Sequence, residues 1–166
     1  MKRHWHNIWV AVLVLCCLVS AVAAQSPGDD TTPRSPVAVF GDWRTSCEND
    51  QPCRMAQTIV QPSTRRLILQ IKVFSGEEAT ALLTFPLGIL LSTGWQYDID
   101  GGRKTVLPFE ICNADGCHAG IKLDPQLLSA MKRGNTMRVR FFDAAQTEVN
   151  TEISLIGFTK AYEAMK

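Results

Sequence analysis

The sequence has few of the residues on which catalytic and metal-binding sites depend. It contains 3 histidines, no Cys-x-x-Cys motif and no glycine-rich loop that leads into a Ser/Thr-bearing helix. His4 and His6 lie in a segment that we expect to be removed, so only His118 remains. No serine in a nucleophile-elbow motif accompanies it, and we interpret His118 as a surface residue of a strand. The protein is predicted not to be an enzyme and to use no cofactor.

An excess of charge of either sign is also absent. Lys2 and Arg3 are the only basic residues before Gln25, so 15 of the 17 basic residues remain beside all 16 acidic ones. A basic surface of the kind that binds nucleic acid requires a clear positive excess. Nucleic acid is therefore not an expected partner.

No apolar run is long enough for a permanent membrane anchor, which needs about 20 residues. The run from Ile8 to Val19 follows Lys2 and Arg3 and precedes the small residues at positions 21–24. These three features together are typical of a signal peptide, which we assign to residues 1–24; a retained anchor is the alternative. After cleavage we expect a periplasmic protein without a transmembrane anchor. Secretion and association with the envelope are the alternative locations.

Residues 25–36 hold three prolines among Ser, Gly, Asp and Thr. Such a composition buries too little apolar surface to order itself, so this segment is predicted to be a flexible leader. One domain is expected to occupy residues 37–166.

Four cysteines remain after the signal: Cys47, Cys53, Cys112 and Cys117. In an exported chain an even number of cysteines favours disulfides. We favour Cys47–Cys53 and Cys112–Cys117, because each pair brackets a turn that brings its ends together. A zinc site built from all four cysteines and a redox-active pair are the alternatives. No metal is the expected state.

Alternating apolar residues predict a series of short strands, of which Arg65 to Ser75 is the clearest, with Leu67, Leu69, Ile71 and Val73 on one face. Gly41 is expected to kink a first strand that runs from Val37 to Cys47. The alternation around Cys112 conflicts with that around Cys117, and a β-bulge between Phe109 and Cys112 would resolve the conflict.

Helical signals are confined to two places. Asp124 and Pro125 predict the start of a short helix that ends near Gly134. Phe158, Ala161 and Tyr162 recur at helical spacing and predict a short C-terminal helix. Many short strands with little helix indicate an all-β, two-sheet sandwich.

Aromatic and basic residues of the strands suggest a binding surface. Its candidates are Trp43, Trp95, Tyr97, Arg138 and Arg140. Aromatic residues of strands more often lie in the core, and arginines that alternate along a strand more often lie on a solvated face. Both interpretations stay open at this point.

The chain from Phe40 to about Met165 resembles the invasion-associated locus B (IalB) family of exported proteins from Gram-negative bacteria. The matching segments, in order, are Gly41-Asp42-Trp43 with Cys47 and Cys53, residues 86–91 with Gly94, Ile99-Asp100-Gly101, Cys112 to Ala119, and residues 154–158 with Ala161. The resemblance implies an immunoglobulin-like β-sandwich in the cell envelope, mostly the periplasm, and implies no catalytic residues.

The expected function is therefore that of a non-catalytic periplasmic protein that binds a protein or an envelope component. A factor for adhesion to or invasion of host cells is one alternative. A redox or metal protein that uses Cys47, Cys53, Cys112 and Cys117 is the other.

Overall fold

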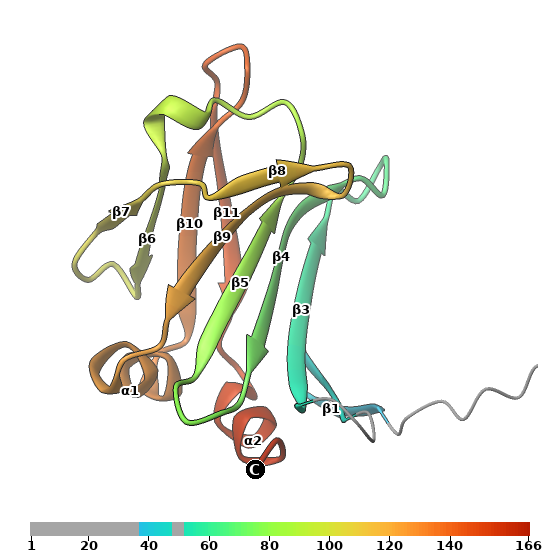
Figure 1. The fold of residues 1–166 in the computed structure, drawn as a ribbon, viewed down its shortest axis with the longest axis vertical. Coiled ribbons are helices and arrows are strands. Elements are labelled where there is room, and N and C mark those ends of the chain that lie inside the picture. The colour runs from blue at the N-terminus through green and yellow to red at the C-terminus, as the bar shows by residue number, and fades with distance from the viewer. Residues whose placement is uncertain (1–36, 48–51) are drawn as a thin grey trace, which may run out of the picture. The chain divides into compact units, whose positions relative to one another are not determined.

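Two antiparallel sheets make up most of the structure, a computed structural model that describes residues 37–47 and 52–166 (Figure 1). The predicted signal peptide and leader, residues 1–36, lie outside the described residues, as do residues 48–51. The predicted two-sheet, all-β fold with two short helices is confirmed. Eleven strands are described rather than the smaller number that the sequence patterns suggested.

The larger sheet has seven strands in the order β1-β2-β3-β4-β5-β9-β8. Their bounds are Val37–Phe40 (β1), Trp43–Ser46 (β2), Arg54–Val60 (β3), Leu67–Phe74 (β4), Thr80–Phe85 (β5), Gly116–Lys122 (β9) and Ile111–Asn113 (β8). The smaller sheet has the order β11-β10-β6-β7. Its strands are Glu148–Ser154 (β11), Thr136–Phe142 (β10), Trp95–Ile99 (β6) and Thr105–Leu107 (β7). Leu91–Thr93 forms a single 3₁₀ turn (η1) before β6.

The core lies between the inner faces of the two sheets. Alternation places Leu69, Ile71 and Val73 of β4 on the inner face of the larger sheet, where each is fully buried. Phe85 of β5 joins the two layers, because its ring lies 5.5 Å from that of Trp95 and 5.2 Å from that of Phe141 in the smaller sheet. Each such large apolar side chain stabilises the fold by about 1.5 to 3 kcal/mol through burial.

Gly41 does not kink one long strand, as the sequence suggested. It begins a two-residue turn, Gly41-Asp42, which folds β2 back against β1. Gly41 has φ of +59°, and Asp42 does not share a positive φ. Glycine at the first central position is typical of the type II′ turns that close tight hairpins. Val37–Phe40 is consequently an edge strand of the larger sheet.

The conflict of alternation around the second cysteine pair is resolved by a bulge, as predicted. Ile111 is the register partner of His118, yet the Glu110 N–H also donates to the His118 carbonyl at 2.9 Å. Two residues of one strand thus oppose one residue of the other. Phe109 can then face the core while Cys112 lies directly opposite Cys117.

The two helices lie together at one end of the sheets (Figure 1). Helix α1, Pro125–Arg133, begins at Asp124, whose carboxylate accepts the Leu127 N–H at 2.8 Å. Helix α2, Phe158–Glu163, buries Phe158 fully, and its Thr159 hydroxyl donates to the Lys132 carbonyl at the end of α1. Both helices were predicted. Among the described residues, no helix has the length and apolar character needed to cross a membrane.

Candidate functional site

The β1–β2 hairpin is fixed to the smaller sheet through two glycines. A Cβ on Gly157 would lie 2.1 Å from the Phe40 carbonyl oxygen, and a Cβ on Gly41 would lie 2.5 Å from the Ile156 oxygen. Gly157 also has φ of +88°. The backbone of the hairpin turn therefore packs directly on the backbone of the β11–α2 turn, at a distance that only glycine permits.

Two buried side chains join the same regions through Ser154. The Gln57 side chain accepts the Ser154 N–H at 2.9 Å and donates to the Ser154 carbonyl at 3.0 Å. Its amide group thus makes the two hydrogen bonds that the backbone of a neighbouring strand would otherwise make. The Trp43 indole N–H donates to the same carbonyl at 2.9 Å. Trp43 also packs edge-on against Phe158, with ring centroids 5.2 Å apart. Trp43 thus fixes β2 of the hairpin to β11, and Gln57 fixes the neighbouring strand β3 to the same residue.

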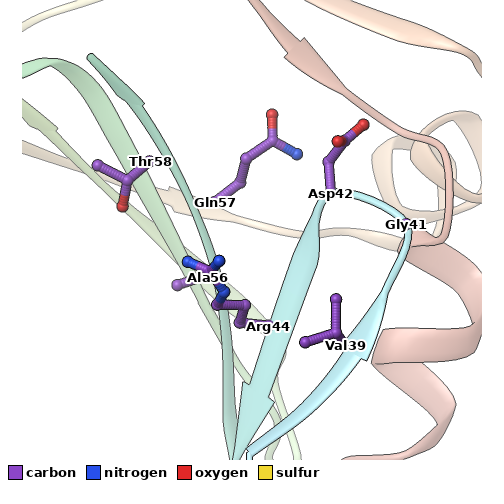
Figure 2. A pocket seen from close by; sticks show the side chains of 7 residues that line it. All are labelled: Val39, Gly41, Asp42, Arg44, Ala56, Gln57 and Thr58. Carbon is purple, nitrogen blue, oxygen red and sulfur yellow. The ribbon is translucent and has the colours of Figure 1, made fainter.

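Two hollows flank the hairpin so anchored. The smaller, about 340 Å³, is lined by Val39, Gly41, Asp42, Arg44, Ala56, Gln57 and Thr58 (Figure 2). Asp42 and Gln57 lie at one end of this hollow, and Val39 and Arg44 lie at the other. The larger, about 500 Å³, lies between β1 and the β11–α2 turn. Its lining is Val39, Phe40, Gly41, Lys132, Leu155, Ile156, Gly157, Thr159 and Lys160. Val39 and Gly41 border both hollows.

The surface between these hollows is apolar at its centre and charged at its rim, with Asp42 and Arg44 at the smaller hollow and Lys132 and Lys160 at the larger one. Val39 is 62% exposed and Ile156 is 63% exposed, although both are large apolar residues. Lys132 lies 3.9 Å from Glu163 and over the ring of Tyr162, whereas Lys160 makes no ion pair with a described residue. Exposed apolar groups with a polar rim are typical of interaction sites.

The binding surface predicted from Trp43, Trp95, Tyr97, Arg138 and Arg140 does not exist as a surface. Trp43 is 0% exposed and Trp95 is 1% exposed, and Tyr97 packs half-buried against Trp95. Alternation directs these aromatic rings to the inner faces, so they belong to the core.

Arg138 and Arg140 do lie outward on β10, but carboxylates surround them. Arg138 pairs with Glu152 at 3.4 Å and with Asp98 at 3.9 Å, while Arg140 pairs with Glu148 at 3.5 Å. The two arginines are far more typical of a solvated sheet face than of a binding site.

The four cysteines form the two disulfides that the sequence favoured, Cys47–Cys53 and Cys112–Cys117. A zinc site made from all four is incompatible with the sheet. The first pair joins β2 to β3 and the second joins β8 to β9, and β4 and β5 separate these strands. At about 4.8 Å per strand, the two pairs cannot converge on one ion. Within residues 37–47 and 52–166, no three His, Cys, Asp or Glu side chains cluster as metal ligands would.

His118 is held at both ring nitrogens. Its Nδ1 lies 3.0 Å from the Thr84 hydroxyl, and its Nε2 lies 3.1 Å from Asn113 Oδ1. The Asn113 oxygen also accepts the Asp115 N–H, which fixes the orientation of the amide. Nε2 is therefore the donor to Asn113, and the hydrogen bond between Nδ1 and the Thr84 hydroxyl completes the contacts of the ring. These bonds join β5 and β9 to the hairpin turn and give His118 a structural role.

The Asp100 carboxylate stabilises the turn after β6 and, within the described part of the chain, does not form a cation site with neighbouring carboxylates. Its carboxylate accepts the N–H groups of Asn135 and Thr136, at 3.0 and 2.9 Å. These two hydrogen bonds, with that of Asn135 the stronger influence, lower the pKa of Asp100 below its ordinary value of 3.8. Asp98 similarly accepts the Gly101 N–H at 2.7 Å.

Sequence reasoning missed the site at the β1–β2 hairpin. Val37 and Val39 read as ordinary strand residues, and nothing in the pattern shows that their strand lies at an edge. Gly157 was noticed only as part of a longer matching segment. The signal that would have found the site is the turn at Gly41-Asp42, which places β1 outside β2.

Comparisons with known proteins agree with one another. The family model described as invasion associated locus B (IalB) protein matches residues 43–166. Invasion protein B homologues from two strains of Brucella abortus are each 27% identical over 154 residues, which span 89% of this chain and 87% of theirs. The crystal structure of invasion associated protein b from Bartonella henselae superposes with a TM-score of 0.72 at 23% identity. That match covers 79% of this chain and 96% of the Bartonella chain.

Proposed function

Because this chain belongs to the invasion associated locus B (IalB) family, we propose that it is an exported envelope protein that binds another protein or envelope component and catalyses no reaction. The observation that carries the proposal is the anchored β1–β2 hairpin, whose Val39 is exposed to solvent together with Ile156 of the adjoining β11–α2 turn, beside two hollows. A fixed surface with exposed apolar groups suits binding.

Three further observations support the proposal. Two disulfides are consistent with folding in an oxidising compartment such as the periplasm. The four cysteines in those disulfides offer no thiolate nucleophile. Both ring nitrogens of His118 are engaged in hydrogen bonds that join strands.

Location is tested by producing the full chain in a Gram-negative host, fractionating the cells and measuring the intact mass of the purified protein. We expect the protein in the periplasmic fraction, without residues 1–24, and four hydrogens lighter than its reduced form. A reduced protein in the cytoplasmic fraction would contradict the proposal.

Binding is tested by chemical crosslinking in intact envelopes with a matched pair of variants. Val39→Asp changes the hairpin, and Val106→Asp makes the same change at a valine of β7 that is equally exposed, at 62%. A crosslinked product that Val39→Asp removes and Val106→Asp retains is the expected result. Identical product patterns for both variants would place binding elsewhere.

A second candidate function is contact with a host cell, favoured by the names of the Brucella and Bartonella relatives, which refer to invasion. Treatment of intact cells with a protease separates the two. Digestion of the protein on intact cells would support host contact, whereas full protection would support a role inside the envelope.

A further inference from the structure

Among the described strands, none pairs with the outer edge of β1. The order of the larger sheet begins with β1, so its only neighbour among the described strands is β2. In a hairpin closed by two residues the closing pair, Phe40 and Trp43, exchanges hydrogen bonds, and Ala38 with Thr45 is the next such pair. The N–H and C=O groups of Val37 and Val39 therefore point away from β2. An added strand would find donors and acceptors already aligned.

The side chains along this edge are also accessible. Val37 is 56% exposed and Val39 is 62% exposed. The two hollows lie at Val39, one bordered by Asp42 and Arg44 and the other by Lys132 and Lys160 of the helices. Successive side chains of an added strand alternate between the two faces of a sheet. Such a strand would place every second side chain toward the larger hollow.

The charged residues around the larger hollow indicate the charge of a polypeptide segment that would bind there. Lys132 and Lys160 are its charged lining residues, and none of the described residues that line it is acidic. Glu163 lies near Lys132, but Lys160 makes no ion pair with a described residue. A second copy of this chain would bring the same two lysines to the hollow and no acidic lining residue to meet them. Like charges so placed oppose that pairing and favour an acidic segment.

We propose that β1 is a docking strand, which takes up an extended polypeptide segment with acidic side chains at alternate positions. The segment pairs with the backbone of Val37 and Val39 and places its carboxylates beside Lys132 and Lys160. Strand addition of this kind obtains affinity from main-chain hydrogen bonds and specificity from the alternate side chains. The proposal rests on the proposed binding function and names the chemistry of its partner.

The anchoring of the hairpin suits this role. Gly41 packs on the Ile156 carbonyl, and Trp43 and Gln57 are bonded to Ser154. A segment that docks on β1 therefore meets an edge already held in place, so little ordering of the hairpin opposes binding.

The test measures fluorescence anisotropy of a short labelled peptide in which glutamate alternates with valine and threonine, added to the full-length exported protein purified from envelopes. The comparison peptides carry lysine in place of glutamate, or N-methyl groups on the amides that would face β1. We expect the acidic peptide to bind about tenfold more tightly than either comparison peptide. Equal affinity for all three peptides, or no binding, would overturn the proposal.

Matched variants locate the site. Lys160→Glu should weaken binding of the acidic peptide about tenfold, and Lys104→Glu, at an exposed lysine of the β6–β7 loop, should not. Val39→Asp should weaken it as well, and Val106→Asp should not. Equal losses for a variant and its control would overturn the proposal.

Two other occupants are outcomes of the same test. Dimers in analytical ultracentrifugation that Val39→Asp dissociates would identify a second copy as the occupant. Binding of the acidic peptide only after deletion of residues 25–36 would identify the leader as the occupant. Either result would overturn the proposal that an acidic segment of another protein binds to β1. Fractionation and crosslinking do not depend on the peptides, so failure here leaves the proposed function standing.

Discussion

The two edges of the seven-stranded sheet end in hairpins that are secured in opposite ways. At one edge the Cys112–Cys117 disulfide links β8 to β9 directly, and all three residues of β8 are exposed. At the other edge no covalent bond joins β1 to β2. The β1–β2 turn is held by backbone contact with Gly157 and by the hydrogen bond from Trp43 to Ser154, and Gln57 of the neighbouring strand β3 bonds the same Ser154.

This difference shows what each kind of restraint requires. A disulfide acts within its own hairpin, mainly by restricting the unfolded chain, and needs no burial of the turn. Non-covalent anchoring requires buried donors and close backbone contact, so it couples the hairpin to the smaller sheet. The structure of the β8–β9 edge, here called the covalent edge, therefore depends on oxidation of its cysteines. The structure of the β1–β2 edge, here called the packed edge, depends on the assembly of both sheets.

The largest loss of stability is expected from a change at the closest backbone contact of the β1–β2 edge, that between Gly157 and Phe40. Gly157→Ala puts a Cβ 2.1 Å from the Phe40 oxygen at φ of +88°. We expect a loss of about 3 kcal/mol in the free energy of unfolding, measured with urea. Gly88→Ala is the control, because Gly88 has a similar φ of +83° and no atom within 4 Å of the added Cβ. It should cost about 1 kcal/mol, and equal losses would show that the backbone contact contributes nothing.

The covalent edge is broken by replacing Cys112 and Cys117 together with alanine. The chain-entropy model gives a loss of about 2 kcal/mol for so short a loop. Replacing Cys47 and Cys53 should cost nearly the same, because the sequence separations are 5 and 6. Calorimetry of the three proteins checks this. A much larger loss for either pair would mean that its cysteines contribute through packing.

A smaller effect on the packed edge is expected from Gln57→Leu, which keeps the volume but leaves the Ser154 N–H without its acceptor. The expected loss is about 1 to 2 kcal/mol. Gln70→Leu is the control, because that amide donates to Thr58 at the surface, and it should change stability by less than about 0.5 kcal/mol. If the two variants denature at the same urea concentration, the bonds to Ser154 do not hold the hairpin.

The smallest effect involves Asp100, which lies outside both hairpins and so serves as a reference. The Asn135 and Thr136 N–H groups lower the pKa of Asp100, so its contribution to stability is present above its ordinary value of 3.8 and is lost as pH falls through the lowered pKa. Asp100→Asn should flatten the dependence of the melting temperature on pH below 3.8. Asparagine also tolerates the positive φ of +48° at this position. An unchanged acid profile would contradict this assignment.

Local patterns predicted many elements, and neighbouring strands explain the failures. The alternation of Leu69, Ile71 and Val73 located β4, and Asp124 located the start of α1, because both signals depend on residues close in sequence. From the sequence Gly41 predicts a kink, because glycine suits a bend and a tight turn equally well. Trp43 and Trp95 were proposed for a surface, because alternation shows that residues share a face but not which face is covered.

The sequence by itself determined the fold class and the two helices, through periodicity and capping. It favoured the observed pairing of the cysteines and a bulge before Cys112 without fixing either. Only the tertiary structure decided that β1 is an edge, that Gly41 and Gly157 meet, and that Val39 stands between two hollows. The physical reason is the separation along the sequence of the residues that meet. The contact of Gly41 with Gly157 and the larger hollow bring together segments more than a hundred residues apart, as Trp43 and Ser154 are with a separation of 111, and no local pattern records such a meeting.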